Sequence, residues 1–305
     1  MMMENAMNFD EMLKNKTDRA EMVLKKYLPQ ESGFQRKVLE AINYSVMAGG
    51  KRLRPILMEE SFLLFGGEGE LIEPFMAALE MIHNYSLVHD DLPAMDNDEY
   101  RRGRETTWKV YGDGMAVLAG DGLLNLAFET AAGAFTFAGD EETYRRIARA
   151  LQVLGRKAGV YGMIGGQTAD IEAESGTEMT EELLLFIHEN KTAALIQAAM
   201  MIGAILAGAD DAAVLKMEKA AYNIGIAFQI QDDILDVTST TQMLGKPVGS
   251  DERNHKLTYV SLHGLQKSGE DVRRLSKEAL DIIGSFEIKN EFLEKLVQSL
   301  ITREK

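Results

Sequence analysis

Apolar residues recur at helical spacing along most of the chain. Val38, Ile42 and Val46, for example, lie four residues apart, which places them on one face of a helix. Glycine, proline or polar residues end such stretches, so the pattern predicts a succession of helices. Segments of alternating Val, Ile or Thr between turn residues are absent, and strands are therefore not expected. The predicted helices span residues 8–27, 33–48, 53–65, 71–92, 115–137, 141–159, 162–174, 180–206, 211–238, 256–267, 270–285 and 289–302.

The predicted helices belong to a single large all-α domain that covers residues 1–305. Only five prolines occur, and no stretch rich in Pro, Gly and Ser divides the chain as a linker. So many apolar helices could surround a central cavity rather than the narrow seam of a four-helix bundle. Thr180 precedes Glu181 and Glu182, and we expect it to cap the N-terminus of its helix.

One segment, residues 192–209, is apolar enough to be considered as a membrane span. It reads TAALIQAAMMIGAILAGA, and its length is at the lower limit for crossing a bilayer. Ala and Gly dominate it, and Gln197 lies inside it, so we interpret it as a helix buried in the protein core. Stable membrane insertion is not expected.

Composition narrows the function classes. The 33 Lys and Arg residues against 48 Asp and Glu give a net charge of −15, whereas proteins that bind nucleic acids or anionic membranes need a basic surface. The absence of cysteine excludes disulfides, thiolate metal sites and cysteine nucleophiles. The N-terminal sequence MMMENAMNFDEMLKNK is polar and acidic, unlike a secretory signal. We therefore expect a cytoplasmic protein.

Two aspartate clusters follow strongly apolar helices that are far apart in the sequence. Asp232 and Asp236 would lie one turn apart on the same side of a helix, where a bound cation would relieve their repulsion. Asp90 and Asp96 are six residues apart and do not align on a regular helix. A proline lies between them, so we predict that the helix ends near Leu92 and that Asp96 returns on a loop.

Carboxylates at the ends of apolar helices are candidates for the mouth of a cavity. Either cluster alone could equally be a solvated acidic helix end. Hard oxygen donors, no Cys and only five His favour Mg²⁺ over Zn²⁺, and the EF-hand spacing for Ca²⁺ is absent. Because Mg²⁺ held by one or two carboxylates keeps its other positions for water and phosphate, cationic groups for phosphate should accompany the clusters.

Lys and Arg do occur beside both clusters, although each one alone is also compatible with ordinary surface charge. Arg binds diphosphate through two hydrogen bonds and Lys acts as a point charge. No Ser-His-Asp signature, G-x-S-x-G or P-loop motif is present, so a side-chain nucleophile is not indicated. The candidate cations are Lys51, Arg52, Arg54, Arg101, Arg102, Arg104, Lys191, Lys246 and Lys256.

These motifs resemble those of the polyprenyl (trans-isoprenyl diphosphate) synthases, and most closely a bacterial-type farnesyl diphosphate synthase. They occur in family order between about residue 40 and residue 260. Glu105 and Trp108 depart from the usual family residues, which concerns loop details rather than the reaction. The matching stretches are GGKRLRP at 49–55, HNYSLVHDDLPAMDNDEYRRGRETT at 83–107, LAGDGLL at 118–124, GMIGGQTADI at 162–171, HENKTAALI at 188–196 and FQIQDDILDVTSTTQMLGKPVGSD at 228–251.

The resemblance implies about a dozen helices around a deep central cavity, usually in a homodimer. It implies head-to-tail condensation of isopentenyl diphosphate with an allylic diphosphate, with up to three Mg²⁺ ions when substrate is bound. The implied metal ligands are Asp90, Asp96 and Asp232, supported by Asp91, Asp233 and Asp236. The implied allylic diphosphate residues are Arg101, Lys191, Thr192, Gln229, Lys246 and Lys256, and the isopentenyl diphosphate residues are Lys51, Arg54, His83 and Arg102.

The most detailed expectation from the sequence concerns the length of the product. Tyr85 and Ser86 lie a little over one turn before Asp90, so the Tyr85 ring could form the floor of the product cavity; simple core packing is the alternative. The aromatic residue and the Pro93-Ala94 insertion resemble a farnesyl-producing enzyme. Rival readings are a geranylgeranyl or other longer-chain synthase, a terpene cyclase and a catalytically silent partner subunit. The DDILD sequence of the second cluster favours condensation over cyclisation.

Overall fold

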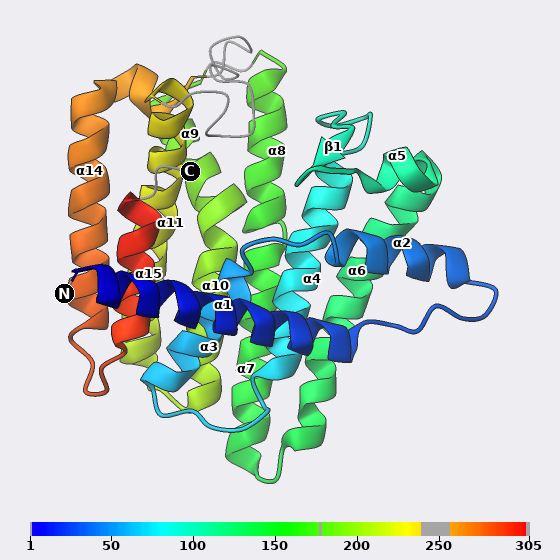
Figure 1. Ribbon diagram of the computed structural model, residues 1–305, viewed down its shortest axis with the longest axis horizontal. Coiled ribbons are helices and arrows are strands. Elements are labelled where there is room, and N and C mark those ends of the chain that lie inside the picture. Colours follow the sequence, from blue (N-terminus) through cyan, green and yellow to red (C-terminus); the bar gives the residue numbers. More distant parts are fainter. Residues whose placement is uncertain (1, 177–178, 239–256, 303–305) are drawn as a thin grey trace. The chain divides into compact units, whose positions relative to one another are not determined.

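The computed structural model describes residues 2–176, 179–238 and 257–302, which are helical apart from one short hairpin and the connecting turns (Figure 1). The predicted all-α fold is confirmed. The helices are α1 (Met2–Tyr27), α2 (Arg36–Val46), α3 (Leu53–Leu64), α4 (Glu73–Asp90), α5 (Thr107–Tyr111), α6 (Asp113–Ala132), α7 (Glu141–Ala158), α8 (Met163–Glu174), α9 (Glu181–Ile187), α10 (Ala194–Ala207), α11 (Asp211–Thr238), α14 (Tyr259–Ile283) and α15 (Glu291–Thr302). A 3₁₀ turn spans Gly133–Phe137, and a π-helix, η2, spans His188–Ala193.

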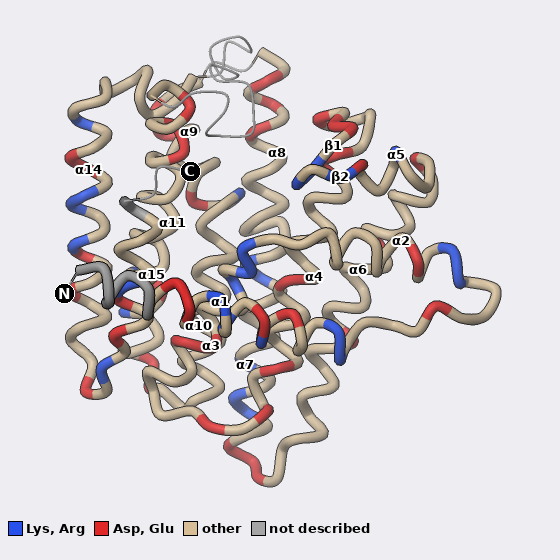
Figure 2. The backbone as a smooth tube through the Cα atoms, viewed as in Figure 1, with Lys and Arg blue, Asp and Glu red and all other residues tan. Residues whose placement is uncertain are grey.

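The chain forms two compact units. The first unit comprises Met1–Glu59 with Glu68–Leu151, and the second comprises Glu60–Gly67 with Gln152–Lys305. Acidic residues occur on helices of both units, in keeping with the net charge of −15 (Figure 2). The prediction of a single functional domain covering residues 1–305 stays a prediction.

The core of the first unit is the pair of helices α4 and α6, against which α1 and α2 pack. Pro74 stands in the first turn of α4, where its missing N–H leaves no hydrogen bond unmade. Most of α4 is buried, including Phe75 and Met81. Buried Glu73 is paired with Lys26 of α1, whose Nζ lies 2.8 Å from Glu73 Oε2. α4 is thus held on several sides, which fixes the residues at its C-terminal end.

The core of the second unit is α11, which packs against α10 and α14. α10 is buried along almost its whole length. Among the described residues, Glu181–Ala207 is the one stretch long and apolar enough to cross a membrane, and 78% of its most apolar window is buried inside the protein. The interpretation of this segment as a core helix is confirmed.

The structure differs from the predicted elements at one hairpin. β1 (Tyr100–Arg101) pairs antiparallel with β2 (Arg104–Glu105), so the expectation of no strands was wrong here. Arg102 and Gly103 have φ values of 54° and 75°, as in the two-residue turns that suit tight hairpins. Strands of two residues are too short to show an alternating pattern, so the pattern of residues did not predict them.

The predicted helix boundaries also differ in two places. The helix expected over residues 180–206 is divided by the π-helix His188–Ala193, and the helices expected over 256–267 and 270–285 form a single α14 with a break at Gly264. Thr180 does cap α9, because its side chain accepts a hydrogen bond of 3.2 Å from Leu183 N. The 3.6-residue pattern therefore locates helices well, but it does not reveal local changes in their winding.

Candidate active site

The first aspartate cluster follows the C-terminal end of α4. After Asp90 the chain turns back, so that Asp96 N donates to Asp90 O at 2.8 Å. Asn97 N donates to Leu92 O at 3.1 Å, and Asn97 adopts a left-handed φ of 55°. The prediction that the helix ends before the proline and that Asp96 returns on a loop is confirmed. The turn brings the Asp90 and Asp96 backbones together, as a shared cation would require.

Asp91 fixes the position of Arg101. Its carboxylate is buried and accepts a hydrogen bond of 2.6 Å from Arg101 Nε, which lies on β1. Burial raises the pKa of Asp91, and the guanidinium of Arg101 partly opposes that rise. Arg101 also lies 3.5 Å from Asp98. The hairpin and the acidic turn are adjacent in Figure 2, so a predicted phosphate-binding cation stands beside the first cluster.

Electrostatic interactions connect three of the four predicted isopentenyl diphosphate residues, Arg54, His83 and Arg102. Burial lowers the pKa of Arg54, and Arg102 lowers it further. Burial followed by Arg54 and Arg102 holds the pKa of His83 well below its usual range. His83 is therefore a neutral hydrogen-bonding group at pH 7. Lys51 is exposed in the same unit, on the turn that precedes α3.

The turn that carries Lys51 is tightly held. Gly50 has a φ of 139°, and a Cβ there would lie 2.8 Å from the guanidinium carbon of Arg102. Arg102 Nη1 donates to the carbonyl of Gly49. Buried Arg52, with a φ of 47°, donates to Glu80 Oε1 at 2.9 Å. Gly50 thus lets the basic turn approach Arg102 of the hairpin, and Gly49 supplies a left-handed φ of 87°.

The two predicted chain-length residues lie on α4 but differ in their contacts. Tyr85 is 6% exposed, and its hydroxyl has no hydrogen-bond partner among the described residues. Burial, with Asp90 nearby, raises the pKa of Tyr85 to about 12. The Tyr85 ring meets the His89 ring edge to face at 5.8 Å. The Ser86 hydroxyl instead donates to the backbone oxygen of His83 at 2.9 Å.

In the second unit, a pocket of about 140 Å³ collects several predicted site residues. Lys191 and Thr192 reach it from the π-helix, and Gln229 and Asp233 reach it from α11. Both polar and apolar groups therefore surround the cavity. Its lining comprises Asp170, Met179, Leu184, Ile187, His188, Lys191, Thr192, Gln229, Asp233, Leu257 and Thr258.

The π-helix sets the directions of Lys191 and Thr192. π-helical turns are rare in proteins, and those that occur are often found at functional sites. Lys191 Nζ lies 2.5 Å from Asp170 Oδ2 of α8, and Thr192 Oγ1 donates to Gln229 Oε1 at 3.0 Å. A Cβ at Gly166 would overlap the backbone of Lys191. Gly166 therefore permits close packing of α8 against the π-helix.

The second aspartate cluster lies near the C-terminal end of α11. Asp232 and Asp236 are partly exposed, and Asp233 is buried. Asp233 Oδ2 accepts a hydrogen bond of 2.8 Å from Tyr259 N and lies 3.9 Å from His188 Nε2. Asp233 is thus held by a backbone N–H group, and its supporting role stays a prediction. The predicted diphosphate residues Lys246 and Lys256 lie outside the described residues.

The carboxylate groups suit a hard divalent cation whose coordination would be completed by water and substrate. Among residues 2–176, 179–238 and 257–302, no three His, Asp or Glu side chains converge as a complete metal site. Each unit instead offers carboxylates close in the chain, Asp90 with Asp96 and Asp232 with Asp236. This suits Mg²⁺, which is commonly held by one or two carboxylates together with water and substrate phosphates.

Sequence reasoning missed two ionisable residues of the second-unit pocket, Asp170 and His188. Both lie within stretches that matched the family, GMIGGQTADI and HENKTAALI, which was the available signal. It also missed Glu80, the buried partner of Arg52. An acidic residue within an apolar helix was the clue to Glu80, because buried carboxylates need partners.

The comparisons with known proteins decide the family. The polyprenyl synthetase family model matches residues 35–298. The chain belongs to the polyprenyl synthetase family. A dimethylallyltranstransferase of Fischerella ambigua (strain UTEX 1903) is 42% identical over 98% of this chain and 85% of its own length. A geranylgeranyl diphosphate synthase of Cyanophora paradoxa is 43% identical over 89% of this chain and 90% of its own length.

Further similarities agree on the fold and differ in the product. A farnesyl diphosphate synthase of Geobacillus stearothermophilus is 40% identical over 87% of each chain. The crystal structure of an FPP/GFPP synthase from Zymomonas mobilis matches with a TM-score of 0.86 and 30% identity, over 97% of this chain and 100% of that one. The names of these relatives span several product lengths, so the family leaves the product of this chain open.

Proposed function

We propose that this member of the polyprenyl synthetase family is a prenyltransferase that makes farnesyl diphosphate. It would condense isopentenyl diphosphate head-to-tail with dimethylallyl or geranyl diphosphate. The observation that carries the proposal is the family match over residues 35–298, which includes both aspartate clusters. The cationic groups beside Asp91 and in the second-unit pocket support it.

Asp90, Asp96 and Asp232 are the residues proposed to hold Mg²⁺, with up to three ions when substrate is present. Bound Mg²⁺ supplies positive charge that stabilises the departing diphosphate. Asp91, Asp233 and Asp236 hold the surrounding groups in place. The allylic diphosphate is bound by Arg101, Lys191, Lys246 and Lys256, and its carbon chain lies near Thr192 and Gln229. Apolar walls exclude the water that would otherwise capture an allylic cation.

Isopentenyl diphosphate is bound by Lys51, Arg54, His83 and Arg102. Their location in the same compact unit supports this assignment. Since the low pKa of His83 keeps it neutral, it can donate a hydrogen bond to diphosphate while the neighbouring arginines supply the charge. The described residues offer no evident side-chain base, and the departed diphosphate is the proposed proton acceptor.

Tyr85 and Ser86 are the proposed chain-length residues. The buried Tyr85 ring is large enough to stop a growing chain, and its buried hydroxyl has no hydrogen-bond partner among the described residues. Geranylgeranyl diphosphate synthesis is the alternative, favoured by the 43% identity to the Cyanophora paradoxa enzyme. Tyr85→Ala with geranyl and isopentenyl diphosphates separates the two: a longer product supports Tyr85 as the floor, whereas an unchanged product places the floor elsewhere.

The proposal includes a cytoplasmic homodimer that binds neither nucleic acid nor membranes. An apolar groove of about 450 Å³ between α2 and α6, with Leu118 54% exposed beside it, supports a second copy of the chain as its partner. The acidic composition, with a net charge of −15, is unfavourable for nucleic acid and anionic lipid.

Incubation with radiolabelled isopentenyl diphosphate tests the function. With dimethylallyl or geranyl diphosphate as the second substrate, we expect a labelled product that chromatographs with farnesyl diphosphate and disappears when EDTA is present. Asp90→Ala should lower turnover by orders of magnitude without unfolding the protein. Absence of isopentenyl consumption by the folded wild type would refute the proposal, and a cyclic product would identify a terpene cyclase instead.

A further inference from the structure

The first turn of α14 is set apart from the rest of the helix. Gly264 has φ and ψ of 78° and 159°, which breaks the helix after His263. Before the break, Thr258 and Ser261 form a reciprocal cap: Ser261 N donates to Thr258 Oγ1 at 3.1 Å, and Thr258 N donates to Ser261 Oγ at 2.9 Å. We call residues 258–263 the entry turn. Its backbone is therefore capped separately from the long part of α14.

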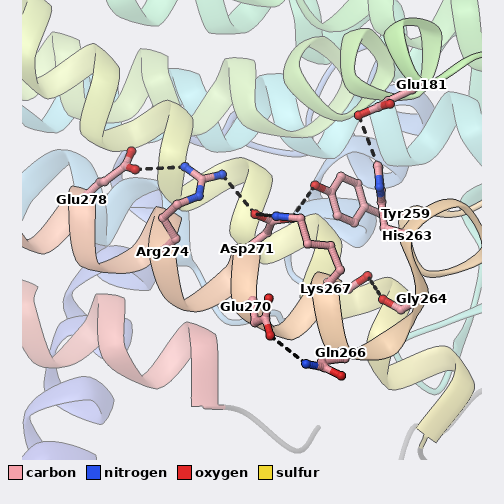
Figure 3. A network of polar contacts seen from close by, with 11 residues as sticks. Glu181, Tyr259, His263, Gly264, Gln266, Lys267, Glu270, Asp271, Arg274 and Glu278 are labelled. Carbon is pink, nitrogen blue, oxygen red and sulfur yellow. Dashed lines mark hydrogen bonds and ion pairs between the residues drawn. The ribbon is translucent and has the colours of Figure 1, made fainter.

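Tyr259 connects the entry turn in two directions. Its backbone N–H donates to Asp233 Oδ2 on α11 at 2.8 Å. Its hydroxyl donates across the break to Asp271 Oδ2 at 2.9 Å (Figure 3). The Tyr259 ring lies 4.4 Å from the ring of His263, whose Nε2 lies 3.3 Å from Glu181 on α9. One residue therefore links the second aspartate cluster to the body of α14.

Asp271 is a rigid anchor for the Tyr259 hydroxyl. Its side chain is buried and also receives Lys267 Nζ at 2.7 Å and Arg274 Nη2 at 3.3 Å. Arg274 is held in turn by Glu278 at 2.9 Å (Figure 3). Burial would raise the pKa of Asp271, but the hydrogen bonds from Lys267, Tyr259 and Arg274 lower it. Asp271 keeps two of these three donors when any one of them is removed.

The entry turn also forms part of the second-unit pocket. Thr258 and the preceding Leu257 line it together with Lys191 and Thr192, and Asp233 contributes from α11. We propose that Tyr259 and Asp271 are positioning residues that hold Asp233 and this wall of the pocket in place for a diphosphate. The inference rests on the proposed function, because it assigns diphosphate to this pocket.

Tyr259→Phe isolates the proposed link. The variant keeps the ring and the backbone N–H and removes only the hydroxyl, and Asp271 keeps Lys267 and Arg274. Inorganic diphosphate with Mg²⁺ is the probe, and its stabilisation of the folded protein against heat measures binding. Losing one hydrogen bond that organises the site should raise the half-saturating diphosphate concentration about fivefold. In turnover, KM for the allylic diphosphate should rise more than kcat falls.

Lys267→Gln is the matched control. It also removes one donor from Asp271, but that donor is not on the path to Asp233, so the half-saturating diphosphate concentration should equal that of the wild type. Asp271→Asn provides a second variant on the path and should weaken diphosphate binding as Tyr259→Phe does. In an Asp233→Asn background, Tyr259→Phe should cause no further loss, because the two act as one unit.

The possible outcomes distinguish a failure of diphosphate binding from a failure of the positioning role alone. A wild type that no diphosphate concentration stabilises would overturn the assignment of diphosphate to the pocket and this inference with it. A wild type that binds diphosphate, with Tyr259→Phe binding equally well, would overturn the positioning role alone. Equal weakening by Lys267→Gln would also overturn it, since Asp271 would then act only through general stability.

Discussion

Gly120 stands where α6 passes the ring of His89. A Cβ at Gly120 would overlap that ring, which is fixed because His89 Nε2 lies 3.1 Å from Val117 O. We expect Gly120→Ala to lower the free energy of unfolding by about 1–3 kcal/mol, because added atoms in a packed interface force displacement. Chemical denaturation measures the change.

Gly114 provides the control on the same helix. No atom lies within 4 Å of a Cβ built there, so Gly114→Ala should leave the free energy of unfolding unchanged or up to about 1 kcal/mol higher. Equal stability of the two variants would show that α4 and α6 separate without cost, contrary to their close packing at His89.

His83 predicts a pH dependence of stability. Burial and the neighbouring arginines keep the pKa of folded His83 well below its usual range, whereas unfolded histidine takes up a proton near pH 6.5. Acidification through that range therefore adds protons preferentially to the unfolded state, and the stability contribution of neutral His83 is lost as pH falls. Between about pH 7.5 and about pH 5.5, the unfolding free energy of the wild type should fall more than that of His83→Asn. Parallel pH profiles would contradict this.

At the scale of elements, the π-helix is the feature on which the second-unit pocket depends. Gly166 of α8 touches the backbone of Lys191, and Gly225 of α11 similarly admits Ala193. Gly166→Ala should displace Lys191 and raise KM for the allylic diphosphate on the order of tenfold to a hundredfold, because small misplacements of binding groups are costly. Steady-state kinetics with varied allylic substrate measure it.

Gly269→Ala serves as the comparison for that variant. A Cβ at Gly269 lies 3.5 Å from Arg273, an ordinary contact, and the site is on α14 away from the pocket lining. Its kinetic constants should match those of the wild type. A wild-type KM in Gly166→Ala would mean that the π-helix tolerates displacement and does not set the position of Lys191.

Comparison of the predicted with the observed helices shows which features the residue pattern determines and which depend on tertiary contacts. α11 spans Asp211–Thr238, as its apolar periodicity predicted, and the return of Asp96 to Asp90 followed from the proline between them. The π-helix escaped prediction because α10, which follows it, is apolar on all sides and so has no single face whose phase an extra residue could shift. The pairings of Lys191 with Asp170 and of Asp91 with Arg101 depend on tertiary contacts, which spacing along one helix cannot reveal.

At the scale of the whole molecule, the proposed function depends on both aspartate clusters. Asp90 belongs to the first unit and Asp232 to the second. If the two clusters serve the same chemical step, loss of either removes one cooperative charge arrangement, because the effects of residues that act as a unit are strongly non-additive.

We therefore expect Asp90→Ala and Asp232→Ala each to lower kcat by a similar large factor, on the order of a thousandfold, with the double variant hardly worse than either single one. Asp281→Ala, an exposed carboxylate on α14, should behave as the wild type. Turnover with saturating Mg²⁺ and radiolabelled isopentenyl diphosphate gives the rates of the wild type and the four variants, and circular dichroism verifies folding. Factors that multiply in the double variant would mean that the clusters serve separate steps and do not act as one unit.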